Sequence, residues 1–137
     1  MSTATTATTE LRRFLTITGQ RFSNGLSAPE MFSPAVDAAW HELLGTPQYE
    51  ALCLETAGQP IRRVANNGYG PIAWVAACEE AYGPLPDIWF TDADGNVDQD
   101  AIARYRQTGT VVAEWDCGPA GGEGDDVAPD QPETARR

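Results

Sequence analysis

Lysine is absent from this sequence and histidine occurs once, so nine arginines supply the basic charge against twenty aspartates and glutamates. The formal net charge of −11 repels phosphate backbones, which argues against a nucleic-acid partner. The single histidine, His41, is the one imidazole on which a catalytic scheme can depend. A chain without lysine but rich in arginine, alanine and glycine is typical of a high-GC bacterial genome.

Signals for export, membrane insertion and disulfide bonding are also missing. Residues 1–9 have neither the basic region nor the apolar region of a signal peptide. No apolar run approaches the roughly 20 residues that a membrane-spanning helix needs. The three cysteines, Cys53, Cys78 and Cys117, are odd in number and form no CxxC pair, which predicts free thiols. We therefore expect a bacterial cytoplasmic protein without a membrane partner.

Apolar residues that recur every three or four positions predict the fold class. The chain has 137 residues, of which 42% are hydrophobic, and this allows one domain with one core. Ser33-Pro34 and Thr46-Pro47 each combine an N-cap side chain with a proline suited to the first helical turn. Helices are predicted over residues 9–22, 34–44, 47–57, 71–82 and 99–107. We expect a mainly α fold, a small irregular bundle of about five short helices with a C-terminal extended segment.

The expected domain organisation is a disordered N-terminus at residues 1–8, a single helical domain at 9–117 and a disordered acidic tail at 118–137. The tail consists largely of Gly, Pro, Asp and Glu and has almost nothing to bury. Residues 59–70 are rich in Pro, Asn and Gly and are predicted to form a loop. Residues 88–90 are expected to be a short extended apolar patch.

One helix is predicted to carry two side chains suited to proton transfer. Asp37 and His41 are four residues apart, so they share a helix face, and the carboxylate is able to orient the imidazole. These two residues are the candidate catalytic pair. The alternative is a boundary histidine in an ordinary helix-surface ion pair.

A basic pair stands out in the acidic chain. Arg62 and Arg63 are candidate ligand-binding residues, because two guanidinium groups are able to clamp a carboxylate or a phosphate. The alternative is a solvated loop face that balances nearby acids.

Metal and cofactor signatures are weak. If Gly95 occupied the invariant glycine position of an EF-hand loop, the first ligand would fall on Phe90 and the bidentate glutamate on Ala101, so no calcium loop is predicted. We expect no metal and no cofactor. Cys117 is expected to be accessible beside flexible chain, with its pKa raised by the neighbouring Glu114 and Asp116.

A family resemblance covers roughly residues 33 to 90. The motif from Val36 to His41, followed by Tyr49, Cys53 and Gly58, resembles the VDxxWHxxL…Y…C…G core of the glycine-rich domain-containing protein family and its small actinobacterial relatives. The stretch from Tyr69 to Trp89 is similar to the second half of that pattern. Relatives commonly have a His-His pair after the glycine, but Arg62 and Arg63 stand at about that place here. The resemblance therefore implies neither a metal site nor an assigned reaction.

These observations favour a non-catalytic interaction or accessory protein with a protein partner. Its expected docking patch is aromatic and consists of Trp89, Phe90 and Trp115. The alternative is a small enzyme or anionic-ligand-binding domain that uses His41 and Asp37 with Arg62 and Arg63. A metal-dependent function needs three or more ligands that the sequence does not obviously supply.

Overall fold

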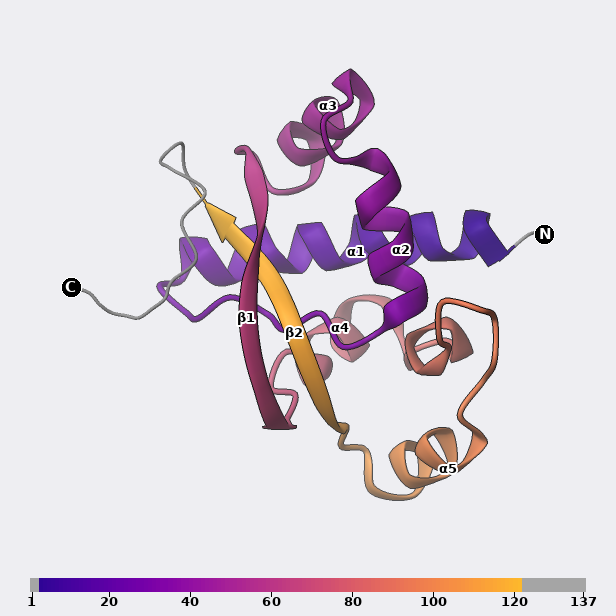
Figure 1. Ribbon diagram of the computed structural model, residues 1–137. Coiled ribbons are helices and arrows are strands. Elements are labelled where there is room, and N and C mark those ends of the chain that lie inside the picture. Colours follow the sequence, from indigo (N-terminus) through magenta and orange to yellow (C-terminus); the bar gives the residue numbers. More distant parts are fainter. Residues whose placement is uncertain (1–2, 122–137) are drawn as a thin grey trace.

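A computed structural model describes residues 3–121 of the chain (Figure 1). In chain order the elements are α1 (Thr3–Ser23), α2 (Pro34–Leu43), α3 (Pro47–Thr56), β1 (Ile61–Pro71), α4 (Val75–Tyr82), the 3-10 helix η1 (Asp87–Phe90), α5 (Gln99–Thr108) and β2 (Val112–Gly121). The mainly α prediction is wrong, because a two-stranded antiparallel sheet accompanies the helices and makes the fold mixed α/β.

The helix starts lie where the N-cap signals predict them. The Ser33 hydroxyl accepts a hydrogen bond from the Val36 N–H at 3.1 Å, and the Thr46 hydroxyl accepts one from the Tyr49 N–H at 3.1 Å. Each side chain satisfies a backbone donor that the first helical turn cannot pair internally. α4 differs from its prediction and begins at Val75, because the backbone N–H of Ile72 is still bonded to Val111 O beside the sheet.

The sheet replaces the loop predicted at residues 59–70. β1 and β2 pair antiparallel from Ile61 with Gly121 to Pro71 with Val112, and the register shifts between Ala65 and Gly68. The Asn and Gly residues that indicated a loop are accommodated by this bulge. The pairing joins segments about fifty residues apart, so no local pattern in either strand reveals it.

Both predicted boundaries of the domain need correction. α1 begins at Thr3, inside the segment expected to be disordered, and Ala7 is already part of the core. β2 continues to Gly121, past the expected boundary at residue 117, because its last four residues pair with β1. The rest of the predicted acidic tail, from residue 122, lies outside the described residues.

The core is built around α1, which runs behind both the sheet and α2 (Figure 1). Phe14 on α1 lies within 5.4–5.9 Å, centroid to centroid, of three buried tryptophans, Trp40, Trp74 and Trp89. Gly19 permits close packing against the end of α3, since a Cβ there would stand 2.7 Å from the Cα of Ala57. Among the described residues, no helix has both the length and the apolar character needed to cross a bilayer.

Candidate functional site: an acidic groove beside the sheet

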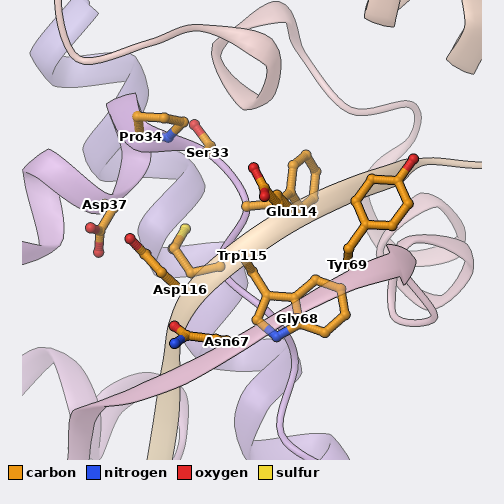
Figure 2. Close-up of a pocket in the computed structure, with 11 residues that line it drawn as sticks. Ser33, Pro34, Asp37, Asn67, Gly68, Tyr69, Glu114, Trp115 and Asp116 are labelled. Atoms are coloured by element: carbon orange, nitrogen blue, oxygen red, sulfur yellow. The ribbon is translucent and has the colours of Figure 1, made fainter.

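An open groove of about 830 Å³ lies where the start of α2 faces the two strands (Figure 2). Its walls come from three parts of the chain: the segment 31–34 with Asp37, residues 67–69 of β1 at the end of its bulge, and residues 114–116 of β2. Figure 2 shows the carboxylates of Asp37 and Asp116 at one end and the rings of Tyr69 and Trp115 at the other. The groove is therefore polar at one end and aromatic at the other. We call it the acidic groove.

The charge of the acidic groove has one sign. Asp37, Glu114 and Asp116 line it, and none of the described lining residues is basic. Glu114 and Asp116 are exposed to solvent, and Tyr69 keeps 72% of its surface exposed. The site thus offers two solvated carboxylates and an accessible aromatic ring, which are groups that attract cations.

The third carboxylate, that of Asp37, is neutralised by Arg63, which is not itself a lining residue of the groove. Its Nε and Nη2 donate to the two carboxylate oxygens of Asp37, each at 2.9 Å. This hydrogen bonding to Asp37 raises the pKa of the Arg63 guanidinium. The guanidinium carbon also lies 5.9 Å from the centroid of the Trp40 ring. Asp37 and Arg63 therefore form a bidentate ion pair that joins α2 to β1.

The predicted catalytic pair of Asp37 and His41 is loosely arranged. His41 Nε2 lies 3.8 Å from Asp37 Oδ2, beyond hydrogen-bond range, and the side chain of His41 is 57% exposed. His41 is also absent from the lining of the acidic groove. The carboxylate that was expected to orient the imidazole instead accepts both of its strong hydrogen bonds from Arg63.

The two arginines do not act together. They are neighbours on β1, not on a loop, and neighbouring side chains of a strand point to opposite faces. Arg62 donates from Nη2 to the backbone oxygen of Gly121 at 3.4 Å, whereas Arg63 is bound to Asp37. This arrangement does not form the predicted clamp for an anion.

Cys117 is buried, contrary to its predicted accessibility, because β2 continues past it and pairs with β1. Its thiol donates to Asp37 Oδ1 at 3.4 Å. Burial, and then the negative charge of Asp37, raise the pKa of this thiol to about 12. The thiolate needed for nucleophilic or metal-binding chemistry is therefore strongly disfavoured. Within residues 3–121, no group of three or more His, Cys, Asp or Glu side chains is placed to hold a metal ion.

The predicted aromatic docking patch is divided between the core and the groove. Trp89 and Phe90 are buried, because η1 turns the chain where an extended segment was expected and directs both rings inward. Trp115 lines the acidic groove and lies against Gly68, where an added Cβ would stand 2.3 Å from the indole Cζ2. The glycine in the β1 bulge thus provides the space that the Trp115 ring occupies.

Among the groove residues that the sequence does not predict as site residues, four carry polar or aromatic groups and lie on the strands. They come from both strands: Asn67, Tyr69, Glu114 and Asp116. The spacing of Glu114 and Asp116 by two residues was available as a signal, since a strand would place both on one face. The position of Tyr69 opposite Glu114 depends on the register of the sheet.

Comparisons with known proteins give no parallel for this chain, since no family model, curated protein or solved structure matches it.

Proposed function

We propose that the protein is a non-catalytic interaction module that binds a basic segment of a partner protein in the acidic groove. The observation that carries this proposal is the composition of the groove: its lining, as described for residues 3–121, combines three carboxylates and an exposed tyrosine and includes no basic residue. A cationic side chain finds a carboxylate and an aromatic face close together there.

The binding free energies expected from these groups favour a protein segment over a small amine as the ligand. An exposed ion pair contributes roughly 0.2–1 kcal/mol, and an exposed cation–π contact about 0.5–1 kcal/mol. Two free carboxylates and one tyrosine ring therefore give a single small cation about 1–3 kcal/mol, which is weaker than millimolar binding. A segment with several cationic side chains adds main-chain and apolar contacts along the groove and reaches useful affinity.

The alternative, an enzyme or anion-binding domain, has less support. It needs Arg62 and Arg63 to face one ligand beside His41, but Arg63 is occupied by Asp37 and Arg62 reaches toward the end of β2. The acidic groove also repels an anionic substrate.

A direct binding experiment tests the proposal. The probe is a short fluorescent peptide of alternating arginine and threonine, compared with a version in which glutamate replaces arginine. Charge reversal of two groove residues, E114K with D116K, is matched by E50K with E80K, which makes the same change in net charge at exposed positions on α3 and α4.

We expect saturable binding of the arginine peptide and none of the glutamate peptide. Reversal in the groove should weaken binding by about tenfold or more, whereas the control reversal should change it by less than about threefold. Equal losses in the two double variants would mean that the total charge of the protein, not the groove, attracts the peptide. That result, or a failure of the arginine peptide to bind, would refute the proposal.

A further inference from the structure

The two edges of β2 differ in their hydrogen bonding. One edge pairs with β1 from Val112 to Gly121, with an interruption at Asp116, which lies opposite the β1 bulge. On the other edge, the backbone bond recorded within residues 3–121 runs from the Met31 N–H to the Cys117 carbonyl, at 3.2 Å. Met31 therefore forms a single β-bridge to β2 and does not extend it into a third strand.

Ser33 and Pro34 explain why the pairing stops at this bridge. Ser33 caps α2, and Pro34 occupies its first turn, so the chain turns away from β2 directly after Phe32. The Ser33 hydroxyl also donates to the carbonyl of Ile88 at 2.8 Å, which holds this turn against η1. Within residues 3–121, no other strand lies beside the edge of β2 from Asp116 back to Val112.

A second hollow of about 530 Å³ continues from the acidic groove along this edge. The two hollows share Phe32, Pro34 and Glu114, so they are adjacent. Residues 114–116 line the first hollow, and residues 112–114 line the second. Consecutive side chains of a strand point to opposite faces, so three consecutive lining residues indicate that the backbone edge between the faces is open.

The open edge has the length of a short binding site. Five residues from Val112 to Asp116 extend for about 13 Å at roughly 3.3 Å per residue. Across the second hollow, α5 contributes Ala101 and Arg104. The second hollow thus lies between β2 and α5, and within residues 3–121 the backbone groups of β2 on this side have no strand partner from Val112 to Asp116.

Charge indicates the kind of segment that fits. Five carboxylates line the two hollows, from Asp37, Asp92, Asp98, Glu114 and Asp116, and Arg104 is the single basic residue among the described lining residues. A second copy of this chain, with a net charge of −11, is repelled from such an edge. A basic segment is attracted to it. Glu114 and Asp116 are two residues apart, so basic residues at alternate positions of an added strand lie beside them.

We infer that a basic segment of a partner protein adds to the free edge of β2 as a third β-strand. This inference rests on the proposed function and specifies how the partner binds. Backbone hydrogen bonds to β2 supply part of the affinity, and alternate cationic side chains facing Glu114 and Asp116 supply the specificity.

Backbone methylation of the same arginine–threonine peptide tests the strand geometry. One version carries N-methyl groups on every arginine and the other on every threonine. In an added strand, alternate N–H groups of the peptide point at β2. One methylation pattern therefore removes the N–H groups that donate to β2, and the other modifies N–H groups that point away from it. We expect one methylated peptide to bind within about threefold of the unmodified peptide and the other to bind about tenfold or more weakly.

The outcomes separate this inference from the proposed function. Suppose that the unmodified peptide binds, that E114K with D116K weakens this binding, and that the two methylated peptides bind equally. The strand geometry is then refuted, and the groove remains a binding site. If the unmodified peptide does not bind, both proposals fail. Hydrogen exchange of the protein without peptide tests the competing occupant. If the protein forms a dimer in which the amides of residues 112–116 exchange slowly, the edge is covered by a second copy and the inference is refuted.

Discussion

The ion pair between Asp37 and Arg63 allows a quantitative test of how the acidic groove is held together. Replacing Asp37 with alanine leaves a guanidinium that is 22% exposed without its carboxylate partner, itself 18% exposed. Breaking a buried pair costs about 3–5 kcal/mol, and an exposed pair contributes about 0–1 kcal/mol. This pair lies between those limits and has bidentate geometry, so we expect the free energy of unfolding to fall by about 2 kcal/mol. For a domain of this size, the melting temperature should fall by about 8 °C.

A double-mutant cycle isolates the interaction from other effects of the substitution. The four proteins are the parent, D37A, R63A and the double variant, and urea unfolding followed by tryptophan fluorescence gives each free energy. We expect a coupling energy of about 1–2 kcal/mol. The control cycle uses Arg106 and Asp87, which make one contact of 3.4 Å and are 70% and 58% exposed. Its coupling energy should stay below about 0.5 kcal/mol. A coupling energy for Asp37 and Arg63 no larger than the control would refute the conclusion that this pair stabilises the junction of α2 and β1.

Three further predictions concern Cys117, Gly68 and Tyr49. The pKa of the Cys117 thiol is raised to about 12 from an ordinary value near 9, so the unfolded thiol loses its proton first and the free energy of unfolding should fall as pH rises from about 9 to 12. Urea titrations across this range should show a shallower decline for C117A, and an identical slope would contradict the assignment. Gly68→Ala should force the Trp115 ring to move and reduce stability by about 1–3 kcal/mol, and unchanged tryptophan emission and melting temperature would count against the close contact. Tyr49→Phe removes a hydroxyl that accepts a hydrogen bond from the Trp40 indole N–H and donates one to the carbonyl of Ile61 on β1. The free energy of unfolding should therefore fall by about 1–3 kcal/mol in thermal melts. A melting temperature within about 1 °C of the parent would contradict this prediction.

The helices could be predicted because their signals are local. Ser33, Thr46 and Asp98 each cap a helix by accepting a bond from the backbone three residues ahead. Gly109 ends α5 in the left-handed conformation, with φ of 74°, which glycine adopts without steric cost. A capping motif involves only a few consecutive residues, and those residues are visible in the sequence.

The sheet could not be predicted in the same way, because its stability comes from pairing between distant segments. Local preferences of Asn67 and Gly68 favour a loop, and Pro119 favours a break, yet all three lie within paired strands or their bulge. Tertiary pairing overrides weak local preferences in such segments. The predicted C-terminal extended segment gave no evidence of a pairing with residues 61–71.

Only part of the candidate site could be predicted, because the sheet brings together residues that are distant in the sequence. Asp37 was identified from its helical spacing with His41, but its principal partner is Arg63, which the sheet brings from a predicted loop. The predicted anion clamp failed because adjacent strand residues face opposite sides. The sequence places Glu114 and Asp116 beside Cys117, but the groove that they line exists only once β2 is paired.

The pairing of β1 with β2 also affects how the chain folds as it is synthesised. β1 is synthesised about fifty residues before β2 is complete. The segment that contains Arg62 and Arg63 therefore has no strand partner while α4, η1 and α5 are synthesised. The thiol of Cys117 and its hydrogen bond to Asp37 come into place only when that last strand arrives. A nascent chain halted before residue 112 should therefore contain helices but lack the sheet, and a protease should cleave it readily near residues 61–71.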